Sequence, residues 1–219
     1  MIKDISQYKT LVFDCDGVVL DSNKVKTAAF YEASKHYGLE CANKLIEYHV
    51  ANGGVSRYAK FRYFLTEIVG KSEVCDAELR ELLGKFSSAV KSGLLTCGVA
   101  EKLAELRDKT PDSTWLIVSG GDQAELREVF KKRNIARYFN GGIYGSPDTK
   151  EQILAREIRA NNIRQPALFL GDSKYDAKVA VEASIDFVFM TQWTEVDAWK
   201  YWLLENGYTS KSKLANFVD

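Results

Sequence analysis

The fold is decided by the stretch Thr10-Leu11-Val12-Phe13-Asp14-Cys15-Asp16-Gly17. Four apolar residues run without interruption and stop at a pair of aspartates and a glycine. An unbroken apolar run of this length is typical of a strand buried on both faces of a parallel sheet. Asp14 and Asp16 are two residues apart, so their side chains share a direction while the chain stays extended. The stretch therefore predicts a buried strand that ends in two carboxylates.

Three further apolar runs have this character, and small, polar or acidic residues close each of them. They cover residues 115–118, 167–170 and 187–190, and a shorter glycine-bounded segment lies at 141–145. Helical patterns lie between them, over residues 99–109, 123–133, 150–160 and 175–183. This alternation from about residue 93 onward predicts a doubly wound α/β fold around a parallel sheet.

The segment after the first strand breaks the alternation, because residues 22–92 contain helical patterns only. A single crossover between neighbouring strands does not need that length. We therefore predict a catalytic α/β core of residues 1–21 and 93–219, with residues 22–92 inserted as an all-helical cap. The candidate cap helices are 23–37, 42–50, 56–69 and 76–91.

The overall composition is that of a globular protein. The chain has 219 residues, of which 46% are hydrophobic and 27% charged, enough for one sizeable core or a core with a small insert. Lys and Arg together number 30, as do Asp and Glu, so the net charge is zero. A neutral chain lacks the electrostatic footprint of a general nucleic-acid or anionic-membrane binder. We expect neither partner.

The cysteine pattern and the hydropathy of the chain argue against a zinc protein and against a membrane-spanning protein. The four cysteines are irregularly spaced, form no C-x-x-C pair and are accompanied by only two histidines. This pattern argues against a zinc site. The start of the chain has no apolar signal-peptide region, and no run is long enough to span a bilayer. We expect a soluble, cytoplasmic protein with reduced thiols.

Polar residues follow the predicted strands, where open parallel sheets bind their ligands. Asp14 and Asp16 follow the first strand, and Asp172 and Asp176 follow the run at 167–170. Carboxylates that converge on one point repel each other unless a cation neutralises them. Oxygen ligands without His or Cys favour Mg²⁺, which keeps coordination positions open for phosphate oxygens. The pattern therefore indicates a magnesium site that binds a phosphorylated ligand.

Two other strand ends supply groups that favour anions. Gly120 and its neighbouring glycine let the backbone approach an anion closely, and Ser119 adds a hydroxyl donor. The pair Ser146-Pro147 predicts a helix N-cap followed by proline at the first helical position. Lys150 would then lie near the start of that helix, where its ammonium offsets the gathered negative charge.

These motifs, in this order, resemble those of the haloacid dehalogenase-like superfamily, in its phosphatase branch with a helical cap. That branch includes phosphoglycolate phosphatases and β-phosphoglucomutase-like proteins. Residues 14–22 resemble the first family motif, Ser119 the second, Lys150 the third and residues 171–176 the fourth. The resemblance covers the whole chain. It implies a Rossmann-like core with a cap and magnesium-dependent hydrolysis of a phosphate monoester of a small metabolite, such as a sugar phosphate or a phosphorylated small acid.

The resemblance also implies a role for each motif residue. Asp14 would be the nucleophile that takes the phosphoryl group as an aspartyl-phosphate. Asp16 would protonate the leaving alcohol and then deprotonate the attacking water. Asp14, the backbone carbonyl of Asp16, and Asp172 would bind Mg²⁺, with Asp176 acting through water or Lys150. Dehalogenases lack an acid at position 16 and transport ATPases carry Thr there, so Asp16 indicates phosphate-ester chemistry.

The cap contains one further candidate binding residue. Ser56 is a candidate N-cap residue for the helix that follows. The periodicity predicts that this helix has a buried face made of Tyr58, Phe61, Leu65 and Ile68. Arg57 and Lys60 fall on another face. The string Gly54-Val55-Ser56-Arg57 resembles the cap loop that touches substrate in β-phosphoglucomutase-like members. By that analogy, Arg57 would bind a second anionic group of the substrate.

Two alternative functions use the same groups. A β-phosphoglucomutase-like sugar phosphomutase would keep the nucleophile, but such mutases carry His at the position that matches Lys26. A phosphoaspartate signalling receiver also combines clustered Asp with Ser or Thr and Lys, yet it normally lacks an insert of about seventy residues. The physiological substrate and the oligomeric state stay open at this point.

Overall fold

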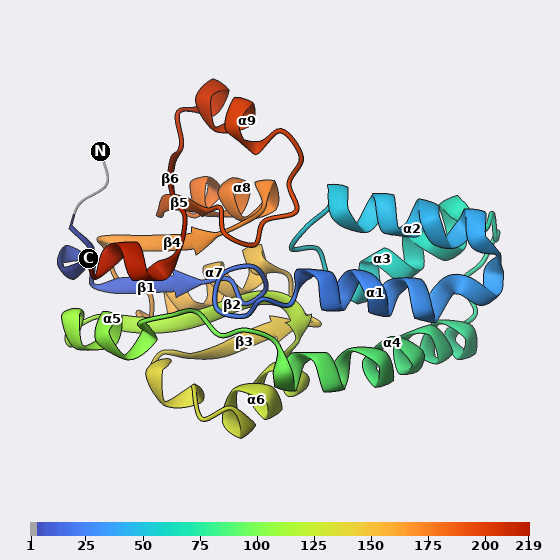
Figure 1. Ribbon diagram of the computed structural model, residues 1–219, viewed down its shortest axis with the longest axis horizontal. Coiled ribbons are helices and arrows are strands. Elements are labelled where there is room, and N and C mark those ends of the chain that lie inside the picture. The colour runs from blue at the N-terminus through green and yellow to red at the C-terminus, as the bar shows by residue number, and fades with distance from the viewer. Residues whose placement is uncertain (1–3) are drawn as a thin grey trace.

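The computed structural model describes residues 4–219, and its strands form one six-stranded sheet flanked by helices (Figure 1). Every strand pair is parallel, and the strand order is β3-β2-β1-β4-β5-β6. This order reverses between β1 and β4, the kind of switch point at which open α/β sheets bind ligands. The strands are β1 Thr10–Phe13, β2 Thr114–Asp122, β3 Gly142–Ser146, β4 Ala167–Gly171, β5 Asp186–Met190 and β6 Thr209–Lys211.

Side chains of the central strands enter two separate cores, one on each face of the sheet. Leu11 and Phe13 of β1 belong to one core and Val12 to the other. Burial on both faces explains why these strands show no apolar–polar alternation. Helices α5 Leu103–Lys109 and α6 Gln123–Lys132 pack on the first face, and α7 Lys150–Arg159, α8 Lys174–Glu182 and α9 Trp199–Asn206 on the second. The predicted doubly wound α/β fold is confirmed.

Four helices that follow β1 form the predicted helical cap beyond one end of the sheet (Figure 1). The rings of Phe30, Phe61 and Phe86 meet at its centre, with ring centroids 4.5 to 6.0 Å apart. Burial of aromatic side chains is the main source of stability for a small helical unit of this kind. The cap helices are α1 Asn23–Ser34, α2 Leu39–Ala51, α3 Arg57–Tyr63, which continues as a π-helical turn at Phe64–Ile68, and α4 Asp76–Thr96.

Helix α4 crosses the predicted cap boundary at residues 92 and 93 and ends only at Thr96. Gly93 lies inside the helix, where a Cβ would lie 2.4 Å from Cγ1 of Val25 on α1. Gly93 therefore allows α4 to approach α1 closely, and it does not mark the end of α4. The chain re-enters the core where Val99 bridges to Leu20. The division into core residues 1–21 and 93–219 and cap residues 22–92 remains a prediction.

The remaining helical segments are short. Turns of 3-10 helix lie at Ile5–Gln7, Lys35–Tyr37, Ala136–Tyr138 and Leu214–Phe217. Across residues 4–219, no helix has both the length and the apolar character needed to cross a membrane.

The predicted N-cap of α7 is wrong. Ser146 is the last residue of β3, and its hydroxyl donates to the carbonyl oxygen of Gly120 at 2.8 Å. The N-cap is Thr149, whose hydroxyl accepts from the backbone N–H of Gln152, while the Gln152 side chain accepts from the Thr149 N–H. This reciprocal capping box satisfies the backbone N–H groups of Thr149 and Gln152. Lys150 is consequently the first residue of α7.

The predicted buried face of α3 is only partly right. Phe61 and Leu65 are buried and Ile68 packs against the core, as predicted, whereas Tyr58 is half-buried. Arg57 and Lys60, predicted on another face, are buried as well and line a cavity next to the core domain. Hydrophobic periodicity cannot find such a face, because it assumes that buried residues are apolar.

We expect Phe86→Ala to destabilise the protein more than any exposed aromatic substitution. Phe86 is 1% exposed and contacts Phe30 and Phe61, so its truncation leaves a cavity that costs about 3–5 kcal/mol of the free energy of unfolding. Tyr201→Ala is the matched control, because Tyr201 is 75% exposed and should change that free energy by about 0.5 kcal/mol or less. Denaturant titration of both variants checks this, and equal losses would contradict it.

Candidate active site

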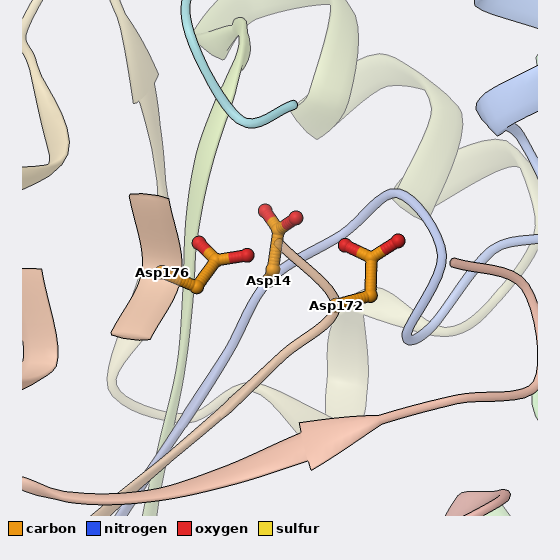
Figure 2. Close-up of side chains that lie close together, drawn as sticks. All are labelled: Asp14, Asp172 and Asp176. Carbon is orange, nitrogen blue, oxygen red and sulfur yellow. The ribbon is translucent and has the colours of Figure 1, made fainter. Parts of the chain in front are cut away.

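Three aspartates converge at the switch point of the sheet (Figure 2). Asp14 directly follows β1, Asp172 directly follows β4, and Asp176 lies in the first turn of α8. All three are buried, and each offers a carboxylate oxygen within 4.8 Å of the others. Figure 2 shows their carboxyl groups side by side and pointing the same way. The structure thus brings together three of the predicted site residues.

The charges of these carboxylates oppose one another. Burial, with added repulsion from Asp176 and Asp16, raises the pKa of Asp14 to about 7, although Lys150 acts in the opposite direction. Burial and the charges of Asp14 and Asp176 raise the pKa of Asp172 well above its usual value. Such shifts mean that the ionised forms lack compensating charge. A cation bound between Asp14 and Asp172 would supply it.

The oxygen atoms of the cluster fit a divalent metal. Oδ1 of Asp14 is buried, and the Lys150 ammonium lies 2.8 Å from it as an ion pair. Asp172 is oriented by Asn23, whose Nδ2 donates to Oδ2 at 2.7 Å and also to the carbonyl oxygen of Trp193 at 2.8 Å. A purely oxygen donor set without His or Cys suits Mg²⁺. The residues present therefore fit the predicted ion.

Lys150 holds one side of the cluster together. It is 1% exposed, and its ammonium contacts both Asp14 and Asp176. Burial lowers its pKa, but the two carboxylates outweigh this and raise it, so the ammonium stays charged. Asp176 is itself fixed, because its Oδ2 accepts from the backbone N–H and the hydroxyl of Ser173, at 3.1 and 2.7 Å. Lys150 thus lies where the sequence predicted it.

Asp16 lies next to the cluster but is engaged by other partners. Its Oδ1 accepts from the hydroxyl of Ser22 at 2.5 Å, and its Oδ2 forms an ion pair with Lys26. Burial raises the pKa of Asp16, but the charge and hydrogen bond of Lys26 and the hydroxyl of Ser22 outweigh it, so the pKa lies below its usual value. Asp16 is therefore an ionised carboxylate in this arrangement.

Ser119 and Gly120 lie within β2, not after it as predicted. The strand continues to Asp122, with an irregular register between Val118 and Asp122 that the predicted apolar run did not reveal. The hydroxyl of Ser119 is 3.5 Å from Oδ2 of Asp16 and accepts from the backbone N–H of Gly121 at 3.0 Å. Ser119 is thereby next to the aspartates, at the predicted edge of the sheet.

A loop of the cap covers this edge. A Cβ on Gly120 would lie 2.1 Å from the carbonyl oxygen of Gly54, and one on Gly54 would lie 3.5 Å from the Lys150 ammonium. The loop therefore approaches both the β2 end and the lysine closely. Only glycines permit this distance between the cap and the core.

Arg57 faces the same space but already has a carboxylate partner. Its guanidinium forms an ion pair with Glu125 of α6, donates to the hydroxyl of Ser87 at 3.1 Å and lies over the ring of Phe86 at 4.5 Å. The pair joins the cap to the core. The predicted contact of Arg57 with an anionic substrate group remains a prediction.

The cap and the core enclose a cavity of about 50 Å³, room for a few water molecules. Asp14, Asp16 and Asp172 line its core side, and Arg57 lies on its cap side. Sequence reasoning missed four further polar residues that line the cavity, Asn23, His49, Lys60 and Glu195. Asn23 lies in the first turn of α1, Lys60 in the middle of α3, His49 in the last turn of α2 and Glu195 in the loop before α9, so they share no local sequence signal.

Comparison with known proteins agrees with this geometry. The sequence model of the family described as haloacid dehalogenase-like hydrolase matches residues 11–190. The chain belongs to that family. The match runs from β1 to β5 and so includes every site residue predicted from the sequence. Among curated proteins, no match was found.

Solved structures share the fold of this hydrolase at low sequence identity. A haloacid dehalogenase-like family hydrolase from Streptococcus pneumoniae is 19% identical over 93% of this chain and 94% of its own, with a TM-score of 0.66. A protein described as a predicted phosphatase from Clostridium acetobutylicum is 17% identical over 94% of each chain, with a TM-score of 0.71. One described as a predicted phosphoglycolate phosphatase from Haemophilus somnus is 18% identical over 85% of this chain and 87% of its own, with a TM-score of 0.65.

We expect Mg²⁺ to stabilise the folded hydrolase through Asp14 and Asp172. An ion present at 100 times its dissociation constant adds about 2.7 kcal/mol to the free energy of unfolding. Thermal melts with and without Mg²⁺ should show this gain in the wild type and lose it in Asp172→Asn. The exposed Asp112→Asn is the control and should keep the gain. A gain that persists in Asp172→Asn would contradict the assignment.

We also expect Gly17→Ala to abolish that stabilisation by Mg²⁺. Gly17 has a φ of +78°, and a Cβ there would lie 1.9 Å from Oδ2 of Asp172. An alanine would therefore strain the loop and displace the carboxylate. Gly84→Ala in α4 meets no atom within 4 Å and should raise stability by up to about 1 kcal/mol. Unchanged Mg²⁺-dependent melting in Gly17→Ala would refute this role.

Proposed function

We propose that this hydrolase is a magnesium-dependent phosphatase that cleaves small phosphate monoesters through an aspartyl-phosphate on Asp14. The convergence of Asp14, Asp172 and Lys150 at the switch point carries the proposal. In this arrangement the Asp14 carboxylate lies between the Lys150 ammonium and the Asp172 carboxylate, and the two carboxylates together offer oxygen ligands suited to Mg²⁺. When bound, the ion would offset the charge of the incoming phosphate and of the carboxylates that hold it.

In the first step, a carboxylate oxygen of Asp14 attacks phosphorus and the bond to the leaving alcohol breaks. Like-charge repulsion opposes this attack unless nearby cations reduce it, and Lys150 lies 2.8 Å from Oδ1 of Asp14. Ser119 and the backbone around Gly120 would bind phosphate oxygens. Asp172 would hold Mg²⁺ together with Asp14 and the backbone carbonyl of Asp16, and Asp176 would keep Lys150 in place.

Asp16 would act as the general acid in the first step and as the general base in the second. It would donate a proton to the leaving oxygen and then accept one from the water that attacks the phosphoaspartate, which restores Asp14 and releases phosphate. Substrate-free Asp16 is ionised and paired with Lys26. An arriving phosphate brings negative charge beside Asp16 and competes for Lys26. Both changes raise the pKa of Asp16 toward the protonated form that the first step requires.

The cap would close over the substrate. Its loop lies against Gly120 and near Lys150, and the enclosed space is small. Opening admits the substrate, and closure excludes bulk water during the first step. The phosphatase names of two structural neighbours support the same reaction class. Family membership as a hydrolase argues against a signalling receiver, and no observed contact favours a mutase over a phosphatase.

We expect Asp14→Asn to lower kcat for a generic aryl phosphate by about 10³-fold or more, because an amide cannot act as the nucleophile. The fold should survive, because the substitution removes one of the repelling charges. Steady-state kinetics and a thermal melt of the same preparation check both expectations. Asp112→Asn is the control and should retain wild-type kinetics. Substantial turnover by folded Asp14→Asn would remove the nucleophile assignment.

A further inference from the structure

One buried cation of the cavity has no role in the steps above. Lys60 of α3 is 1% exposed and lines the cavity that Asp14 and Asp172 also line. Within residues 4–219, no carboxylate oxygen lies within 4.0 Å of its ammonium. Its contacts are Nδ1 of His49 at 2.7 Å, the carbonyl oxygen of His49 at 3.3 Å and the ring of Phe30 at 5.5 Å.

The other cations of the cavity are neutralised. Lys26 pairs with Asp16, and Arg57 pairs with Glu125. Lys150 lies between two aspartates. Lys60 alone among these four lacks an anionic partner in the described part of the chain. Its charge is accordingly poorly compensated, and burial together with the charge of Lys26 lowers the pKa of Lys60 to about 7.

His49 fixes the position of the Lys60 ammonium. Burial and the charge of Lys60 lower the pKa of His49 to about 2, so the imidazole is neutral. Because Nδ1 faces the Lys60 ammonium at 2.7 Å, it acts as the acceptor, and the ring proton lies on Nε2. Nε2 lies on the opposite side of the ring from Lys60 and is buried without a hydrogen-bond partner among residues 4–219. A neutral imidazole holds the ammonium in place but does not compensate its charge.

We propose that Lys60 binds an anionic group, a carboxylate or a second phosphate, on the leaving alcohol of the substrate. This inference rests on the proposed phosphatase function. It makes Lys60 a specificity-determining residue, separate from the cations that serve the scissile phosphate. An anion would pair the buried ammonium, whereas an uncharged alcohol would leave its charge uncompensated. Arg57, already paired with Glu125, is the weaker candidate for this contact.

The test compares three phosphate monoesters whose two-carbon leaving alcohols differ only in the group at the second carbon. They are phosphoglycolate, ethane-1,2-diyl bisphosphate and 2-hydroxyethyl phosphate, which carry a carboxylate, a second phosphate and an uncharged hydroxyl there. We expect the wild type to have a higher kcat/KM for at least one of the first two, called the anionic esters after their leaving group, than for 2-hydroxyethyl phosphate. In Lys60→Met, that ratio should fall about tenfold or more, because a buried charge pair is lost. Lys60→Arg keeps the charge and should recover part of it. The two anionic esters distinguish a carboxylate site from a phosphate site.

Lys44→Met is the matched control, because Lys44 lies on α2 of the cap, is exposed and pairs only with Glu40. It should leave the ratio unchanged. A thermal melt of each variant accompanies the assay and establishes that the variant is folded. If Lys60→Met loses its fold, Lys60→Gln replaces it in the same comparison.

The outcomes separate the two proposals. Hydrolysis of 2-hydroxyethyl phosphate that is lost in Asp14→Asn supports the phosphatase function whatever Lys60 does. With that activity present, an unchanged ratio in folded Lys60→Met, or a wild type that does not favour either anionic ester, overturns the role of Lys60. Failure of the wild type to hydrolyse any of the three esters or an aryl phosphate counts against the phosphatase function itself.

Discussion

Repulsion among buried carboxylates is the constraint on which the rest of the site depends. Asp14, Asp172 and Asp176 lie within 4.8 Å of one another in the protein interior, an arrangement that no fold adopts without opposing charge. Lys150 supplies part of that charge from the first turn of α7. Part of the negative charge stays uncompensated, and the raised pKa of Asp14 and of Asp172 reflects this. The uncompensated charge is what favours a bound cation at the site.

Although the chain as a whole is neutral, the charged residues at the site are divided between the core and the cap. The core places its carboxylates at the ends of β1 and β4, and the cap places Lys26, Arg57 and Lys60 opposite them. Two of these cap cations form ion pairs with core carboxylates, which hold the cap against the core. A substrate with negative charge at both ends would complete the same pattern.

The strands at the centre of the sheet were predictable because burial on both faces leaves a purely apolar run. β6, by contrast, was not predicted, since Thr209–Lys211 are exposed edge residues without apolar character. The N-cap of α7 was misassigned because Ser146 and Thr149 are both capping residues, and only the Gln152 side chain distinguishes them. The burial of Arg57 and Lys60 was not predicted for a similar reason, because periodicity treats charged residues as exposed.

By itself, the sequence determined which polar residues lie near the carboxyl ends of the central strands, and parallel topology then required that those ends meet at one edge of the sheet. Asp14, Asp16, Ser119, Lys150 and Asp172 were therefore predictable as neighbours. Only the tertiary structure decided which of the surrounding cations already have partners. Pairing between Arg57 and Glu125, and the lack of a carboxylate near Lys60, depend on how the cap packs on the core. Such contacts join residues far apart in the chain, and no local pattern encodes them.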